Sequence, residues 1–203
     1  MKLAIAFLAG CLGFTALSAK ADSKGIEVTA AQVRASSCQT CHGPRGDSAD
    51  PTVPRLNGQL APYIFARLHS MRYPIREAPR AIHNMGDIAP GLDSQVIAAI
   101  ANYYAVQSPT RGHLTNSASA EGERIYKRGA GKDVPACQNC HGMKGQGGAG
   151  APRLAGQHRE YLALQLQAFA MGARIGDPMN HHVWQMPSEQ MQAIASYLGA
   201  GHE

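Results

Sequence analysis

Apolar side chains along this chain recur every three or four residues, the spacing that places them on one face of a helix. No stretch shows the alternation of apolar and polar residues that is typical of a half-buried strand. The predicted helices are 29–35, 62–71, 120–128 and 160–171, together with two that begin at the N-cap candidates Asp93 and Ser188. Loops rich in glycine and proline separate them, at 43–54 and 142–152. The pattern therefore predicts an all-α fold.

The second half of the chain repeats the first. The sequence Pro-Arg-Leu-x-Gly-Gln occurs at 54–59 and again at 152–157. An apolar helical pattern at 97–103 recurs at 191–197. The segment between the copies is rich in Ser, Thr, Gly and Asn, a composition typical of an exposed linker. The predicted units are a first domain at 22–108, a linker at 109–118 and a second domain at 119–203.

A Cys-x-x-Cys-His motif stands at 38–42 and again at 137–141. This spacing is the attachment signature of c-type haem. Two thiols three residues apart can each form a thioether to one vinyl group of a porphyrin, and the histidine that follows can bind the iron. The predicted attachment residues are Cys38, Cys41, Cys137 and Cys140, and the predicted iron ligands are His42 and His141. We therefore expect two covalently bound c-type haems.

Three other interpretations of the cysteine pairs are weaker. The halves of a four-cysteine zinc site usually stand roughly 15–20 residues apart, whereas about a hundred residues separate these motifs. A thioredoxin-like redox pair belongs to a strand-rich surrounding that this chain lacks. A structural disulfide, like the other two, does not explain why histidine follows both pairs. Covalent haem accounts for all the residues of the motif.

The second axial ligand of each iron should stand at a repeated position, because the domains repeat. Met85 lies seven residues before Leu92, and Met179 lies seven before Met186, the equivalent residue of the second copy. Met85 and Met179 are therefore the predicted ligands, and their soft thioether sulfur would raise the reduction potential. Rival ligands stand nearby at His83, His181 and His182. The other methionines are expected to fill the core. The remaining histidines, expected on the surface or in loops, are His69, His113, His158 and His202.

The first 21 residues have the features of a secretory signal peptide. A positive charge at Lys2 precedes a mostly apolar run at 3–17, and Ala19-Lys20-Ala21 forms a cleavage site. The run is too short and too weakly apolar to predict a membrane span. A second interpretation stays open, since Leu8-Ala9-Gly10-Cys11 matches a lipoprotein box that would leave Cys11 lipidated. We expect export to the periplasm, with association to the membrane surface as an open alternative.

Composition and charge limit the classes of partner that the protein is expected to bind. Only 6% of the 203 residues are aromatic, so two haems would supply apolar surface that the side chains lack. The formal net charge of +5 falls to +3 once Lys2 and Lys20 leave with the signal peptide. Without a run of lysine or arginine, nucleic acid binding is disfavoured. Charge is expected to orient a redox partner protein at encounter.

With both motifs, the repeat and the methionine register, the chain resembles the dihaem cytochrome c4 family. The resemblance implies two tandem class I cytochrome c domains, each wrapped around a haem with His and Met ligands. It also implies that the carbonyls of Pro54 and Pro152 accept from the Nδ1–H groups of the haem histidines. In the second domain, Gly122 and Tyr126 would cross the last helix near Tyr197. Four residues have two open roles, binding haem propionates or lining the domain interface on the one hand and solvated bracing of loops on the other: Arg55, Gln59, Arg153 and Gln157.

These residues favour a periplasmic electron carrier over an enzyme. With both axial positions filled by protein, no iron site is open to a small-molecule substrate, and no nucleophile stands beside a base. The resemblance implies a bc1-type complex or a dehydrogenase as donor and a terminal oxidase as acceptor, which are membrane complexes for the most part. One alternative is the electron-accepting subunit of a flavocytochrome c sulfide dehydrogenase or a quinoprotein dehydrogenase. Another is a dihaem enzyme or gas sensor with one open iron.

Overall fold

The structure is a computed structural model that describes residues 38–73, 85–111, 119–148 and 150–199. Within these ranges it is helical, and the only β structure is a pair of isolated bridges, Ala130 with Val134 and Gly148 with Ala151. The all-α prediction is confirmed. The helix expected at 29–35 lies outside the described residues. No helix in the described part of the chain is long and apolar enough to cross a membrane.

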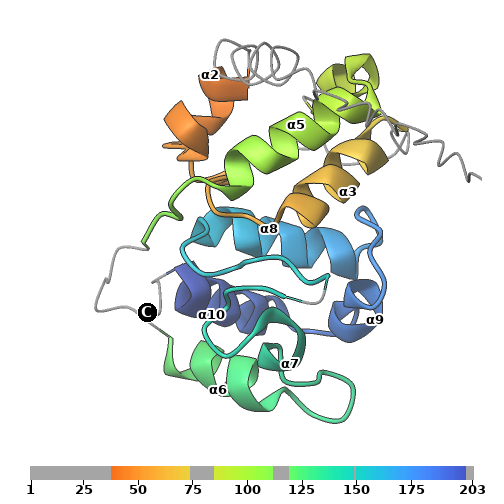
Figure 1. The fold of residues 1–203 in the computed structure, drawn as a ribbon. Coiled ribbons are helices and arrows are strands. Elements are labelled where there is room, and N and C mark those ends of the chain that lie inside the picture. Colours follow the sequence, from red (N-terminus) through yellow and green to blue (C-terminus); the bar gives the residue numbers. More distant parts are fainter. Residues whose placement is uncertain (1–37, 74–84, 112–118, 149, 200–203) are drawn as a thin grey trace, which may run out of the picture.

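The first half consists of one helix pair and a short haem-motif helix, which lies at the upper left in Figure 1. Its helices are α2 (Cys38–His42), α3 (Ala61–Met71) and α5 (Ser94–Ala105), with short 3-10 turns at Pro44–Gly46 and Ala89–Gly91. Helices α3 and α5 pack against each other through the apolar cluster Ile64, Ile100, Ala101 and Tyr104. Asp93 caps α5, since its carboxylate accepts from the backbone N–H of Val96 at 2.8 Å. The predicted N-cap at this helix is confirmed.

The second half contains a fuller helical set. Its helices are α6 (Ala120–Arg128), α7 (Gln138–His141), α8 (Arg159–Ala170), α9 (Met179–Val183) and α10 (Ser188–Gly199). Helix α10 packs against both α6 and α8. The prediction that Ser188 caps α10 is wrong, because Ser188 is already helical. The carbonyl of Pro187, the counterpart of Asp93, accepts from the N–H of Met191 at 3.2 Å. A proline cannot repeat the carboxylate cap of the first half.

Helices α6 and α10 cross at the contact that the resemblance implied. Gly122 lies so close to α10 that a Cβ atom there would collide with the carbonyl oxygen of Ala193 and reach 2.9 Å from the Cβ of Tyr197. One turn later, the rings of Tyr126 and Tyr197 lie 5.6 Å apart. A residue without a side chain is therefore required at position 122, and the aromatic pair closes the crossing beside it.

Helices α3 and α8 face each other where the two halves meet (Figure 1). The N–H of Tyr161 on α8 donates to the carbonyl of Pro51 in the first half, at 3.1 Å. Thr110, near the start of the expected linker, is hydrogen-bonded to the first half. Its hydroxyl donates to Asp47 and accepts from Asn57, both at 2.7 Å. These contacts hold the loop that follows the first haem motif against α8 and against the start of the expected linker.

Candidate haem sites

Each haem-motif histidine is buried and held by one hydrogen bond. His42 ends α2 and His141 ends α7, and each is 6% exposed. The Nδ1–H of His42 donates to the carbonyl of Pro54, and that of His141 to the carbonyl of Pro152, at 2.9 Å in both cases. Burial lowers the pKa of both imidazoles, which favours their neutral form. Since Nδ1 carries the proton, the Nε2 lone pair is left for a metal.

Matching turns hold the two proline carbonyls in place. The N–H of Leu56 donates to the carbonyl of Gly46, and the N–H of Leu154 to that of Gly145, at 2.8 Å in both cases. Gly46 has φ 88° and Gly145 has φ 67°, a region that favours glycine. The hydrogen bonds to the histidines therefore depend on the glycine-rich loops that the sequence repeats.

The cysteines of each motif differ in exposure in the same way. Cys38 and Cys137 are half-buried, Cys41 and Cys140 are exposed, and no disulfide joins these four thiols. The two motifs therefore present their cysteines in the same way, as a repeated attachment site would.

The two predicted methionine ligands differ in their surroundings. Met179 opens α9 and packs with Cys137 against the apolar cluster of the second half. Met85 is half-buried at the start of a helical turn. Among the rivals, His181 is exposed, whereas the Nδ1 of His182 is buried without a hydrogen-bond partner among the described residues. His83 lies outside the described residues.

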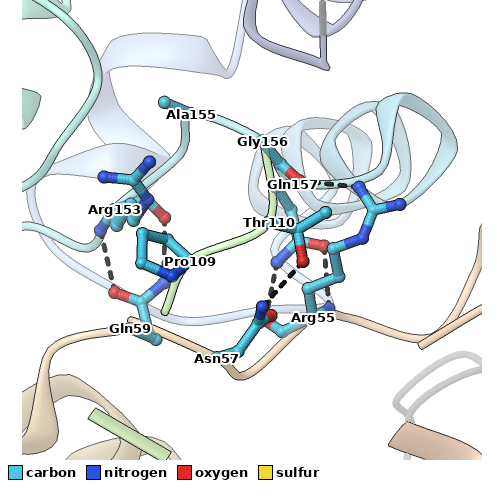
Figure 2. A pocket seen from close by; sticks show the side chains of 9 residues that line it. All are labelled: Arg55, Asn57, Gln59, Pro109, Thr110, Arg153, Ala155, Gly156 and Gln157. Atoms are coloured by element: carbon cyan, nitrogen blue, oxygen red, sulfur yellow. Dashed lines mark hydrogen bonds between the residues drawn. The ribbon is translucent and has the colours of Figure 1, made fainter. Parts of the chain in front are cut away.

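The two glutamines left with open roles line the contact between the halves, in a shallow pocket (Figure 2). The side chain of Gln59 accepts from the N–H of Arg153 and donates to its carbonyl, both at 2.8 Å. Gln157 does the same with the N–H and carbonyl of Arg55, both at 2.9 Å. Each glutamine is 7% exposed. These reciprocal bonds relate the halves by an approximate two-fold axis.

Arg55 makes two further contacts through its guanidinium group. Its Nη1 donates to the carbonyl of Gly156 at 2.7 Å, across the boundary between the halves. Its Nε lies 3.1 Å from a carboxylate oxygen of Asp47. Arg55 is therefore an interface residue as well as a loop brace.

His158 lies in a loop directly before α8, as expected, and it also contacts the other half. Its Nε2 lies 2.9 Å from the hydroxyl and 3.0 Å from the carbonyl of Ser48, a buried residue of the first half. Burial lowers the pKa of His158, and the positive charge of Arg55 lowers it further. The repeat gave no sign of this contact, because the equivalent position of the first copy holds Leu60.

Several buried polar atoms fit a cofactor that these helices would enclose. The Nε of Arg174 and the Nδ1 of His182 are both buried without a hydrogen-bond partner in the described part of the chain. Buried polar groups rarely stay unpaired in native proteins. Together with two free Nε2 atoms on buried histidines, they fit haem, which combines iron, a large apolar face and carboxylates. Sequence reasoning missed Arg174, although Arg76 stands at the same register in the first copy.

Comparison with known proteins also indicates a haem protein. The family model of cytochrome c matches residues 119–201. The chain is 33% identical to cytochrome c4 of Azotobacter vinelandii, over the full length of both proteins. It is 36% identical to a thiosulfate dehydrogenase electron acceptor of Thiomonas intermedia, covering 84% of this chain and 81% of that protein.

Two solved structures share the fold. A cytochrome c4 structure from Acidithiobacillus ferrooxidans is 36% identical and has a TM-score of 0.74, covering 80% of this chain and 98% of that one. Reduced cytochrome c4 from Pseudomonas stutzeri is 29% identical and has a TM-score of 0.76, covering 87% of this chain and 98% of that one. The likeness therefore includes both halves of those molecules.

Proposed function

Because this chain belongs to the cytochrome c4 family, we propose that it carries electrons in the periplasm between a respiratory donor and a terminal acceptor. The chain is an electron-transfer protein that carries covalently attached haem c and works with redox partner proteins; it is not an enzyme. We further propose where the protein works, which residues bind the haem irons, and which proteins donate and accept the electrons. By the same resemblance, a bc1-type complex or a dehydrogenase would be the donor and a terminal oxidase the acceptor.

The observation that carries this proposal is the pair of histidine–proline hydrogen bonds, at 2.9 Å in both halves. An imidazole whose Nδ1–H is held by a carbonyl keeps its ring orientation and is a better donor at Nε2. It also undergoes little rearrangement when the charge on the iron changes. A histidine ligand held rigidly in each half suits a protein in which each haem gains and loses one electron.

The ligand set that we propose is the one the motifs predict. Haem supplies the one-electron ferric/ferrous couple, and the protein holds it and tunes its potential. Thioethers would form at Cys38, Cys41, Cys137 and Cys140, and the axial ligands would be His42 with Met85 and His141 with Met179. With both axial positions filled, each iron is closed to small molecules.

The proposed location and organisation follow from the sequence. Residues 1–21 would direct export, and cleavage would leave domains at 22–108 and 119–203 joined by the linker 109–118. Membrane complexes are the partners that such a location offers. If Cys11 were lipidated instead, the protein would be tethered to the membrane surface and the two haem domains would be the same.

Carbon monoxide tests whether the irons are closed. The reduced protein is titrated with carbon monoxide while its Soret band is recorded, with an open-iron haem protein as the positive control. We expect no change in the Soret band, because a ligated iron has no free position. A shift that corresponds to one or both haems would contradict the carrier proposal and favour a sensor or an enzyme.

A second candidate is the acceptor of one particular dehydrogenase. The likeness to thiosulfate dehydrogenase electron acceptors favours it. So do four exposed apolar side chains of the second half, Met143, Met171, Ile175 and Trp184. A fixed acceptor would co-purify with its dehydrogenase from native membranes or periplasm, whereas a mobile carrier would elute alone and exchange electrons with several partners.

A further inference from the structure

Three rings form a row along α3. The ring centres of Phe65 and His69 lie 5.9 Å apart, and their planes are tilted by only 17°. The ring centres of His69 and Tyr73, which follows the end of the helix, lie 6.2 Å apart. Residues four positions apart are neighbours on a helix surface, so the rings share one face. We call this row of three rings, together with Arg72, the α3 stripe.

The α3 stripe leads from the core to the solvent. Phe65 is half-buried and packs against the apolar cluster of the first half. His69 is exposed, and 70% of Tyr73 is exposed. Aromatic rings gain most of their stabilising energy from the area that they bury. The outer end of the stripe therefore offers apolar area that the described part of the protein does not cover.

The charge along the stripe is positive. The guanidinium carbon of Arg72 lies 5.9 Å from the ring centre of Tyr73, within the range of a cation–π contact. Arg72 forms no ion pair with another described residue. The sequence from 51 to 76 contains neither Asp nor Glu. An acidic surface that approached the stripe would therefore meet no carboxylate from this segment.

The fold itself does not require the stripe. Helix α8 occupies the equivalent place in the second half, and it has neither a ring nor a charge at the four matching positions. These positions hold Ala163, Gln167, Ala170 and Met171. The helix dipole stabilises a positive charge near a helix C-terminus, which accounts for Arg72 but not for the exposed rings. A contact with another molecule accounts for both.

Aromatic residues and arginine are the side chains that contribute most to binding energy at protein interfaces. A ring supplies contact area at a low cost in conformational entropy, because it has few rotatable bonds. Arginine pairs with a carboxylate through two parallel N–H donors. The combination therefore suits a protein surface that carries carboxylates beside apolar side chains.

We propose that the α3 stripe is a docking surface for an acidic segment of a redox partner protein. The inference rests on the proposed function only in that the chain works with redox partners, whichever donor or acceptor is involved. Through Phe65 the stripe is connected to the cluster that contains Tyr104, whose ring lies against the turn at Gly46 after the first haem motif. The partner would therefore be held on the half that carries the first haem, because α8 lacks the same surface.

Polyglutamate is the probe for the acidic segment. The reduced, haem-loaded protein is isotope-labelled, and its amide NMR signals are followed as polyglutamate is added at physiological ionic strength. The largest shifts should occur on α3 and at Tyr73. Arg72→Gln should weaken binding about fivefold, and Tyr73→Ala about threefold. Tyr73→Phe should bind as the wild type does, because it retains the ring.

Arg128→Gln is the matched control. Arg128 is an exposed arginine in the last turn of α6, so this variant removes the same charge from a helix C-terminus in the second half. It should change the affinity less than about twofold, because solvent screens an exposed charge. The proposal is overturned if Arg72→Gln weakens binding no more than Arg128→Gln, or if the shifts lie mainly in the second half. If Arg72→Gln does not accumulate with its haems, Tyr73→Ala decides, because Tyr73 is exposed.

Reduction by membranes of the native host connects the surface to a redox partner. In Arg72→Gln, the half-maximal rate should require about fivefold more cytochrome while the maximal rate is kept. An unchanged half-saturating concentration would overturn the assignment to a redox partner. If the membranes do not reduce the wild-type protein, the proposed respiratory donor is wrong, and the polyglutamate titration alone decides about the surface.

Vesicles of phosphatidylglycerol distinguish a protein partner from an anionic lipid surface. The wild-type protein should not sediment with these vesicles at physiological ionic strength, because the charge of the stripe is small. Sedimentation that disappears in Arg72→Gln but not in Arg128→Gln would assign the stripe to lipid and contradict the proposal.

Discussion

The two halves hold their haem histidines identically but cover the haem motifs with different aromatic residues. In the second half, Tyr126 from the first helix donates its hydroxyl proton to the carbonyl of Gly142 at 2.6 Å. In the first half, Tyr104 from the last helix is buried beside the turn at Gly46, and its hydroxyl has no partner among the described residues. The residue at its position in the second half is Leu198. The ligand geometry is repeated, whereas the packing around it is not.

The contact between the halves also combines features that the repeat duplicates with features that it does not. The reciprocal bonds of Gln59 and Gln157 repeat across the approximate two-fold axis. His158 does not, because its position in the first copy is occupied by Leu60. Symmetric contacts can fix how the halves sit, and the asymmetric residues can then make the two haems unequal. Two unequal haems give a direction to electron flow within one molecule.

The largest effect expected is the loss of one haem without the other. Replacing both Cys137 and Cys140 by Ser removes both thioether attachment points of the second half and should leave one covalent haem on the chain. The matched variant with Cys38→Ser and Cys41→Ser should lose the other haem. Intact-mass measurement reads the haem count directly. A variant that still carries two covalent haems would contradict the assignment of its cysteines.

A smaller but still large effect is expected at the helix crossing of the second half. Gly122→Ala gains up to about 1 kcal/mol of helix propensity, but its Cβ would collide with a backbone oxygen of α10. We expect a net loss of about 1–3 kcal/mol in the free energy of unfolding. Chemical denaturation measures it.

Gly91→Ala is the control in the first half, because a Cβ atom there meets nothing within 4 Å. Equal stabilities for Gly122→Ala and Gly91→Ala would show that the crossing tolerates a side chain.

The two buried tyrosines should respond to loss of the hydroxyl in opposite ways. Tyr126→Phe removes a made hydrogen bond and leaves the carbonyl of Gly142 without this donor, at a cost of about 1 kcal/mol in unfolding free energy. Tyr104→Phe removes a buried hydroxyl without a partner in the described residues, so stability should stay equal or rise. Thermal denaturation of the haem-loaded proteins tests this. If both variants lost the same unfolding free energy, the two tyrosine hydroxyls would contribute equally, which would contradict the difference that we describe between the halves.

The smallest effect expected is a pH dependence from His158. Its pKa is lowered in the folded protein, so its contribution to stability is complete above the ordinary histidine value of about 6.5 and is lost as the pH falls below it. His158→Leu, which copies the first half, should remove this part of the slope between pH 7.5 and 5. The melting temperature of both proteins across that range measures it.

His69→Leu is the control for His158→Leu, because His69 is exposed on α3. An unchanged slope in His158→Leu would mean that the contact with Ser48 does not depend on protonation.

Much of the fold could be predicted because its signals are local. Helical periodicity gave the range 120–128 that α6 occupies, and α3 and α8 begin within one residue of their predicted starts. The histidine–proline bonds followed from the family resemblance and are present. A cap depends on one side chain, and at α10 that position holds Pro187, so the prediction at Ser188 was wrong.

The contacts between the halves could not be predicted in the same way. The repeat marks Gln59 and Gln157 as equivalent, but it does not say that each bonds to the other copy. His158 and Arg174 reach residues more than a hundred positions away, Ser48 and Tyr63, and no local pattern announces such contacts. The domain boundaries and both methionine ligands stay predictions.

The near-infrared spectrum of the oxidised protein tests the central claim most directly, because a methionine sulfur on ferric haem gives a weak charge-transfer band there. We predict a band whose intensity corresponds to two haems and falls by half in Met85→Ala and by half in Met179→Ala. If the wild-type band had the intensity of one haem and remained in Met179→Ala, the second iron would have another ligand. His182 would be the first candidate for that ligand. Absence of the band in the wild-type protein would contradict His/Met ligation in both halves.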